Sequence, residues 1–244
     1  MQTKTFETSQ ALGEAAGNSS ALKIESAIHD NNEANIILAT GASQFATLQT
    51  LINYNIIDWS KVTIFHLDEY VGISENHPAS FRLYLKQRFL EKVGKVKNFH
   101  FINGGAENPV VECERLNKLI NEIDIDVALV GIGENGHLAF NDPPADFDVN
   151  DPYIIADLDE KCKMQQVGEG WFKSLEDVPS QAISMSIKQI MKSKSIICAV
   201  PDARKAQAVK DCVLGDISNL HPASILQNHK DCMIYLDKGS AELI

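Results

Sequence analysis

The sequence has no excess of basic residues, since 22 lysines and arginines stand against 33 aspartates and glutamates, for a net charge of −11. A protein that binds nucleic acid presents a basic face to the phosphate backbone. We therefore expect no nucleic-acid partner. A small phosphorylated ligand is still compatible with this charge, because it needs only a few backbone amides and one or two cations.

Cysteine pairs and long apolar segments are also lacking. The cysteines are odd in number and none has the CxxC spacing: Cys113, Cys162, Cys198, Cys212 and Cys232. This pattern favours neither a zinc site nor a disulfide framework, and it is typical of free thiols in a reducing compartment. Residues 1–17 contain no apolar core of the signal-peptide type, and no run approaches the roughly 20 apolar residues of a membrane span. We expect a cytoplasmic protein with no membrane partner.

Short apolar runs alternate with longer amphipathic stretches along the whole chain. The expected strands lie at residues 35–39, 62–67, 98–102, 127–131, 182–186, 196–200 and 232–236. The expected helices lie at residues 9–30, 45–54, 78–93, 109–123 and 202–214. Pro78, with Ser80 nearby, and Pro109 stand where proline opens helices. The acidic stretch 141–159, which contains three prolines, is the best candidate for a long loop.

This alternation predicts an α/β fold: a single open, mostly parallel sheet with helices on both faces, Rossmann-like in type. Several runs are apolar throughout, as expected for strands that are buried on both faces. No internal repeat, low-complexity tract or Gly/Ser linker divides the chain, so we predict one domain over residues 1–244. Ligands of such sheets bind beyond the carboxyl ends of the strands, which makes the residues after each run the candidates for a site.

The first such cluster is Ala39-Thr40-Gly41-Ala42-Ser43, between an expected strand and an expected helix. Exposed amides and the helix dipole favour an anion such as phosphate at this position. The alternative is an ordinary tight turn in which Ser43 only caps the helix.

The second cluster, His66-Leu67-Asp68-Glu69, has two adjacent acids directly after an apolar run. Carboxylates are costly to bury unless they are hydrated, paired or functional, and a carboxylate at the end of the sheet could take a proton from carbon. Two alternatives stay open. One acid caps a turn while the other is solvated, or His66 and Asp68 bind a metal ion, for which no third ligand lies nearby in the sequence.

The third cluster runs from Gly131 to His137 and has three glycines in six residues, a pattern typical of close backbone approach or positive φ angles. Asp142 follows His137 by five residues, and a nearby carboxylate can fix a histidine's tautomer and tune it near neutral pH. Isolated histidines are more often structural, but two other polar clusters at strand ends favour a functional role here. Lys205 follows a later strand and would add a cation at the same edge, unless it is an ordinary surface lysine.

Together these segments resemble the glucosamine-6-phosphate deaminase family. The matching segments, in the family's order, are ATGAS, FHLDEYVGISENHPASF, DVALVGIGENGHLAFNDPP, the RKA of residues 204–206 and HPASILQNH. The resemblance as a whole covers roughly residues 35–237. The resemblance implies a Rossmann-like fold and the conversion of glucosamine 6-phosphate to fructose 6-phosphate and ammonia. This aldose–ketose isomerisation with deamination requires no metal and no organic cofactor.

The resemblance also implies a role for each matching residue. Asp68 would take the C2 proton of the substrate, and His137 would move protons at the ring oxygen during ring opening. Asn135 and Asp142 would flank and orient His137. The sugar phosphate would be bound by Thr40, Gly41, Ala42, Ser43, Gly136 and Lys205.

The chain departs from the family pattern in several places. Asn135 stands where several deaminases have Asp, and Asp142 stands where many have Glu. The phosphate loop of the family commonly reads Thr-Gly-Gly/Ser-Thr-Pro, whereas here it is Thr40-Gly41-Ala42-Ser43-Gln44. Residues 169–172, Glu-Gly-Trp-Phe, lack the arginine that usually precedes two aromatic residues and grips the phosphate, which bears on the exact substrate. Residues 144–154 lack the Ser and Arg/Lys pattern of the allosterically activated members, so we expect no such activation.

Three alternative functions share part of this pattern. A 6-phosphogluconolactonase has the same fold and a similar glycine-rich histidine motif, although DEYVG and AFNDP favour the deaminases. A deaminase of another amino-sugar phosphate, such as galactosamine 6-phosphate, is the second alternative. The third is a non-catalytic sugar-phosphate sensor, although no DNA-binding appendage is visible. The sequence is compatible with a homo-oligomer.

Overall fold

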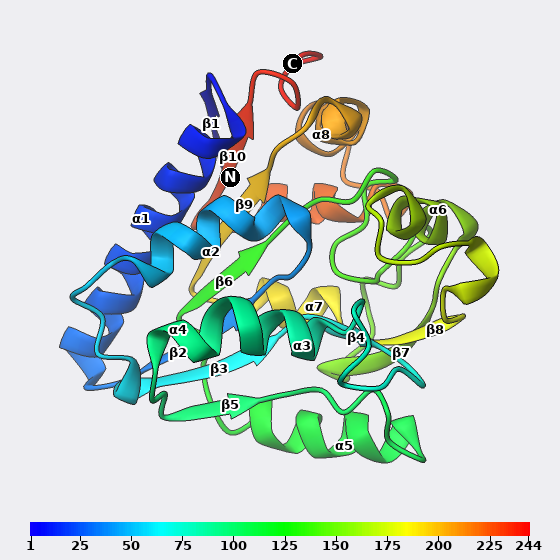
Figure 1. The fold of residues 1–244 in the computed structure, drawn as a ribbon. Coiled ribbons are helices and arrows are strands. Elements are labelled where there is room, and N and C mark those ends of the chain that lie inside the picture. The colour runs from blue at the N-terminus through cyan, green and yellow to red at the C-terminus, as the bar shows by residue number, and fades with distance from the viewer.

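The computed structural model describes all of residues 1–244 and contains two sheets (Figure 1). The larger sheet has seven parallel strands in the order β1-β10-β9-β6-β2-β3-β5. Its strands are β1 (Gln2–Phe6), β2 (Ala34–Leu38), β3 (Val62–His66), β5 (Asn98–His100), β6 (Val127–Val130), β9 (Ser195–Val200) and β10 (Cys232–Asp237). The smaller sheet is antiparallel, in the order β4 (Asp68–Tyr70), β8 (Gln181–Met185) and β7 (Tyr153–Asp157). The expected open, mostly parallel α/β sheet is confirmed.

Helices cover both faces of the larger sheet (Figure 1). They are α1 (Ser9–Asn31), α2 (Phe45–Ile52), α3 (Phe81–Leu85), a π-helical turn (Lys86–Leu90), α4 (Glu91–Val93), α5 (Pro109–Ile120), α6 (Glu160–Gly168), α7 (Ile187–Met191) and α8 (Ala206–Leu214). Short 3-10 turns lie at Ala42–Gln44, Trp59–Lys61, Leu175–Asp177, Ala203–Lys205 and Pro222–Asn228. Ser80 caps α3 and Pro109 opens α5. No helix is both long and apolar enough to cross a membrane.

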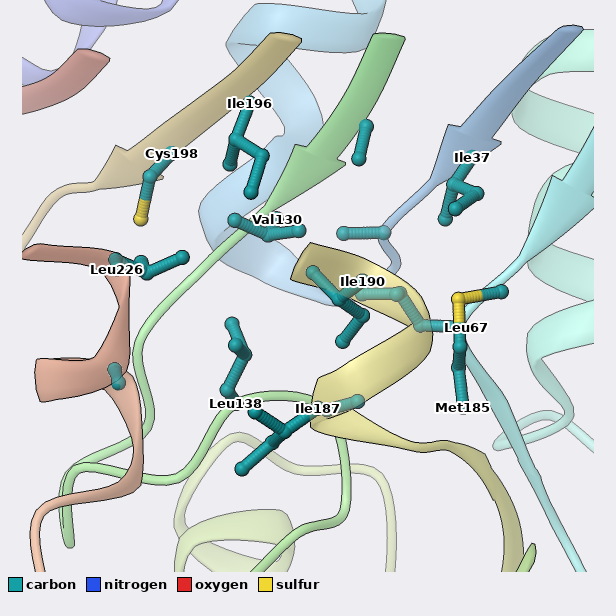
Figure 2. Close-up of a cluster of buried hydrophobic side chains, with 14 of the residues drawn as sticks. Ile37, Leu67, Val130, Leu138, Met185, Ile187, Ile190, Ile196, Cys198 and Leu226 are labelled. Atoms are coloured by element: carbon teal, nitrogen blue, oxygen red, sulfur yellow. The ribbon is translucent and has the colours of Figure 1, made fainter. Parts of the chain in front are cut away.

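The central strands are apolar throughout because successive side chains enter two different cores. Ile37 of β2 and Val130 of β6 join one buried cluster, which includes residues of α5, α7 and α8. Their neighbours Ile36 and Leu129 join the opposite cluster, which is built on α1, α2 and α3. Figure 2 draws part of the first cluster, including Ile190 of α7. Successive side chains of a strand point to opposite faces of the sheet, and both faces are covered, so the whole strand is buried, as the sequence pattern predicted.

The expected strand at 182–186 forms, but it lies in the small antiparallel sheet and not in the parallel one. This strand is also buried on both sides, since Ile183 belongs to the main core and Ala182 to a third cluster with Tyr70 and Phe172. An apolar run does not reveal which sheet it enters. The expected loop at 141–159 is wrong over Tyr153–Asp157, where the chain pairs with β8.

Leu67 connects the two sheets. Its amide donates to the carbonyl oxygen of Leu38 at 3.2 Å in the parallel sheet, and its own carbonyl accepts from Met185 at 2.7 Å in the small sheet. Asp68 follows as the first residue of β4. The chain therefore changes sheets at the carboxyl end of β3, and this change sets the position of Asp68.

Candidate active site

A cavity lies at the carboxyl ends of β2, β3, β6 and β9, against α6. It is lined by Ala39, Thr40, Gly41, Ser43, Gln44, Leu67, Asp68, Phe81, Gly131, Ile132, Gly133, His137, Ala139, Phe140, Gln165, Gln166, Glu169 and Lys205. Six of the predicted site residues are in this lining: Thr40, Gly41, Ser43, Asp68, His137 and Lys205. The other four lie outside it: Ala42, Asn135, Gly136 and Asp142. Because the parallel strands end at one edge of the sheet, residues up to 165 positions apart in the sequence, from Thr40 to Lys205, line the same cavity.

The loop after β2 is held from both sides. Gly41 has φ of +94°, a conformation that favours glycine, and its carbonyl accepts from the Tyr84 hydroxyl at 3.1 Å. The side-chain amide of Gln44 donates to Ser43 Oγ at 3.2 Å and to the carbonyl oxygen of Ala199 at 3.3 Å. Neither the 3-10 turn nor α2 has a side-chain cap, so Ser43 is not the simple helix cap of the alternative interpretation. The start of a helix in this position favours an anion.

Asp68 lies in the cavity wall and is only 7% exposed. Its burial and the neighbouring charge of Glu69 raise the pKa of Asp68 to about 8, while a hydrogen bond with Thr40 acts in the opposite direction. A carboxyl group with such a pKa changes its protonation near neutral pH. It is therefore suited to take a proton from a substrate and return it.

Glu69 and His66 have structural roles instead. The Glu69 carboxylate is fully buried and accepts hydrogen bonds from Ser80 Oγ at 2.7 Å and from the amide of Arg82 at 3.0 Å. It therefore anchors the start of α3. His66 Nε2 accepts from the amide of Ile102 at 2.9 Å, and burial lowers the pKa of His66 to about 3. One acid does cap a turn, as the first alternative held, but Asp68 is not solvated. Because His66 Nε2 is used in this hydrogen bond to the backbone, His66 does not suit the alternative in which it binds a metal ion together with Asp68.

His137 is held by a carboxylate and by a glycine. Its Nδ1 lies 3.0 Å from Asp142 Oδ1, and its ring packs against Gly133. A Cβ atom at Gly133 would lie 2.2 Å from His137 Nε2. Burial opposes ionisation of Asp142, but hydrogen bonds from His137, Asn135 and Asp159 outweigh it and keep the pKa of Asp142 below its usual range. An ionised Asp142 fixes the Nδ1–H tautomer, which leaves Nε2 for proton transfer.

Asn135 and Asp142 support His137 from outside the cavity. Asn135 Nδ2 donates to Asp142 Oδ1 at 3.0 Å and to Asp159 Oδ2 at 3.3 Å, and its Oδ1 accepts from the amide of His137 at 3.1 Å. The amide of Asp159 completes the group by donating to Asp142 Oδ2 at 3.1 Å. Asp159 caps α6, so these bonds link the histidine to this helix, and no local sequence pattern predicts that link.

Gly136 shapes the turn and does not line the cavity. It has φ of +83°. Its amide donates to Gly133 at 3.0 Å, and its carbonyl accepts from Ala223 at 2.9 Å. Gly136 therefore belongs to the backbone of the histidine loop and is not in the lining of this cavity. Ala42 is exposed and is not in the lining of the cavity.

Three side chains come close enough to hold a metal ion in common, since the donor atoms of His137, Asp142 and Cys162 lie within 4.8 Å of one another. Cysteine binds metals as thiolate, whereas burial raises the pKa of the Cys162 thiol well above its usual range. Asp142 already accepts three hydrogen bonds. These donors therefore fit a hydrogen-bonded group better than a metal site.

Lys205 is not a surface lysine. It is 4% exposed, and burial lowers its pKa. The turn that carries it (Ala203–Lys205) begins at Asp202, whose φ is +89° and whose amide donates to the Asp237 carboxylate at 3.1 Å and 3.2 Å. The end of β10 thus fixes the turn that points Lys205 toward the cavity.

Helix α6 and the residue that follows it supply cavity residues that the sequence did not predict: Gln165 and Gln166 on the helix, and Glu169 directly after it. The sequence of α6, EKCKMQQVG, is mostly polar. The helix also does not directly follow any of the strands that the sequence predicted. The only signal was indirect. The departure from the family pattern at residues 169–172 marked this stretch as unusual.

Solved structures share this fold over nearly the whole chain. A monomeric glucosamine-6-phosphate deaminase superposes with a TM-score of 0.91 at 30% identity, with 100% of both chains covered. A 6-phosphogluconolactonase from Trypanosoma brucei superposes with a TM-score of 0.77 at 17% identity, over 99% of this chain and 97% of that one. The second likeness concerns the fold alone.

Sequence comparison leads to the same group. A glucosamine-6-phosphate deaminase of Clostridium acetobutylicum is 38% identical over 212 residues, which cover 85% of this chain and 86% of the relative. One of Listeria monocytogenes is 35% identical over 231 residues, which cover 94% and 96%. The model of the glucosamine-6-phosphate isomerases/6-phosphogluconolactonase family matches residues 7–235. The chain therefore belongs to the glucosamine-6-phosphate isomerase/6-phosphogluconolactonase family.

Proposed function

We propose that this protein converts glucosamine 6-phosphate to fructose 6-phosphate and ammonia. The observation that carries the proposal is the shared cavity of Asp68 and His137, a carboxyl group with a pKa of about 8 beside a histidine held by an ionised carboxylate. Relatives at 35–38% identity that bear the name glucosamine-6-phosphate deaminase support it. Solved structures of 6-phosphogluconolactonases resemble this chain at 13–17% identity, in fold only.

The proposed reaction begins with binding of the phosphate by Thr40, Gly41, Ser43 and Lys205. A fixed phosphate supplies binding energy away from the reacting carbons, which positions C1 and C2. His137 then moves a proton between the ring oxygen and the C1 hydroxyl, so that the ring opens. Asn135 and Asp142 serve as positioning residues, because they hold the imidazole and not the sugar.

The isomerisation itself is assigned to Asp68. Its carboxylate removes the proton from C2, and the electron pair forms a C1–C2 double bond as an oxygen at C1 takes up a proton. Return of a proton to C1 then gives an imine at C2, and water adds to this carbon while ammonia leaves. The product is a ketose phosphate. No electrons are exchanged with any cofactor, so the reaction is balanced with water alone.

A substrate panel tests this proposal. Purified protein with glucosamine 6-phosphate should release ammonia and form fructose 6-phosphate in equal amounts, and EDTA should leave the rate unchanged. Galactosamine 6-phosphate tests the epimer, and 6-phosphogluconolactone tests the rival activity. Lactone hydrolysis without any ammonia release would contradict the proposal and would assign the protein the lactonase activity of the family. Tight binding without any turnover would make it a sensor.

We also propose that the protein works in the cytoplasm, without a nucleic-acid partner. All five cysteines are free and buried, which suits a reducing compartment. The net charge of −11 disfavours contact with a phosphate backbone.

A further inference from the structure

A carboxylate stands in the part of the cavity assigned to phosphate. Glu169 lines the cavity together with Lys205, which is the only lysine or arginine in the lining. Burial lowers the pKa of Lys205, and the negative charge of Glu169 acts in the opposite direction. A chain of contacts also joins Glu169 to the loop after β2: Trp171 donates to Glu169 Oε2 at 3.1 Å and packs edge-on against Tyr84, whose hydroxyl donates to the carbonyl oxygen of Gly41 at 3.1 Å. A fully ionised phosphate would meet one cation and one anion there.

Glu169 is held in place at the end of α6. Its Oε1 accepts from Gln165 Nε2 at 2.8 Å, and its Oε2 accepts from Trp171 Nε1 at 3.1 Å. A carboxylate oxygen has two lone pairs, so each one keeps an acceptor position for a ligand. Arg204 does not neutralise Glu169 by contact, because its guanidinium pairs with Asp202 at 2.8 Å and with Glu134 at 3.3 Å.

We propose that Glu169 makes this cavity selective for a phosphate group that carries one proton. The P–O–H group donates a hydrogen bond to the Glu169 carboxylate, while Lys205 and the amides of the loop after β2 bind the remaining oxygens. No covalent bond changes except that of the proton. The inference rests on the proposed function only in placing a phosphate at this end of the cavity.

Proton uptake follows from this arrangement. The second pKa of a phosphate monoester is about 6, so the ester is mainly a dianion at neutral pH and takes up one proton when it binds next to Glu169. Sulfate is the informative contrast, because it has the same tetrahedral shape as phosphate and the charge of a fully ionised phosphate ester, but no proton to donate at this pH. A carboxylate acceptor should therefore reject sulfate.

Calorimetric titration with inorganic phosphate and with sulfate at pH 6 tests the inference. The wild-type protein should bind phosphate at least about tenfold more tightly than sulfate, since tenfold corresponds to about 1.4 kcal/mol, within the range of one charge-assisted hydrogen bond. Glu169→Gln should bring the two affinities close together. Glu160→Gln removes the same charge from an exposed position on the same helix and should keep the wild-type preference.

Equal binding of phosphate and sulfate by the wild type would overturn the inference, as would an unchanged preference in a folded Glu169→Gln variant. If that variant does not fold, Glu169→Ala replaces it, and the heat of binding of a simple phosphate monoester, glycerol 3-phosphate, at pH 8 in buffers of different ionisation enthalpy counts the protons taken up by the wild type, because the ester is mainly a proton-free dianion in solution at that pH. Uptake near one proton supports the inference, and none contradicts it. These readouts need no turnover. Loss of the proposed deamination, measured by ammonia, is therefore a separate result.

Discussion

The imidazole ring of His137 occupies the space that a side chain at Gly133 would need. A Cβ atom built on Gly133 would lie 2.2 Å from Nε2 and 2.3 Å from Cε1 of the ring. The same ring is held on its other side by Asp142 at 3.0 Å. The histidine is thus fixed between a glycine and a carboxylate, and displacing it from one side must disturb its contact on the other.

Gly133→Ala should therefore lower kcat by at least about tenfold, since a positioned general acid–base typically contributes about 10²–10⁴-fold. Gly168→Ala is the control, because a Cβ atom at Gly168 would meet no atom within 4 Å. Ammonia release measures the rate, and circular dichroism shows whether each variant is folded. Full activity in Gly133→Ala would mean that the position of the His137 ring does not matter for the reaction.

His137→Gln should mainly impair use of the cyclic sugar. Glutamine retains hydrogen-bonding groups but has no group that titrates near neutral pH. A substrate analogue supplied in open-chain form should recover part of the rate, because it bypasses ring opening. If the cyclic and open-chain forms lose equal activity, His137 organises the site and does not open the ring.

Lys205→Ala should raise KM for the sugar phosphate more than it lowers kcat. The expected rise is roughly tenfold to a hundredfold, which corresponds to the loss of one hydrogen bond to a charged group. Lys210→Ala, at an exposed position on α8, is the matched control and should behave as wild type. An unchanged KM in Lys205→Ala would remove Lys205 from the phosphate site.

The stability of the protein should depend on the protonation of Asp68. Burial raises its pKa in the folded state to about 8, above the usual 3.8. Between these two values the unfolded chain has lost the proton that the folded chain still binds, so the contribution of Asp68 falls as pH rises and is lost above about pH 8. Asp68→Asn removes this dependence.

The difference in Tm between Asp68→Asn and the wild type should accordingly shift in favour of the variant as pH rises from 4 to 8. A gain of several degrees is expected, because each kcal/mol shifts Tm by about 2–4 °C in a chain of this size. Scanning calorimetry at a series of pH values measures it. A constant difference across this range would show that Asp68 has an ordinary pKa in the folded state.

The strands and the polar cavity residues at their ends could be predicted because burial on both faces leaves a direct trace in the sequence. Thr40, Asp68, His137 and Lys205 all follow apolar runs, and parallel strands bring their carboxyl ends to one edge. Strand β1 left no such trace, since its residues Gln2–Phe6 are largely exposed at the edge of the sheet.

The positions of the small sheet and of α6 could not be predicted, because they depend on tertiary contacts that no local sequence pattern reveals. Strand β8 is buried like the strands of the parallel sheet, and its partners β4 and β7 lie 111 or more and 24 or more residues earlier in the chain. Gln165 on the polar helix α6 and Glu169 at its C-terminal end reach the cavity because Asp159 caps this helix and its amide bonds to Asp142. Gly136 was assigned to the substrate from its motif alone, whereas its backbone is used within the loop.

Exchange with solvent deuterium tests the central claim most directly, namely that Asp68 is the base that takes the proton from carbon. Wild-type protein and Asp68→Asn are incubated with glucosamine 6-phosphate in D2O, and deuterium on the sugar carbons is followed by NMR. Asparagine keeps the shape and most of the hydrogen bonding, so the variant should still bind the ligand. The wild type should introduce deuterium at C1 of the product, and Asp68→Asn should introduce none at C1 or C2. Deuterium incorporation by a folded Asp68→Asn variant at a rate near that of the wild type would contradict the assignment.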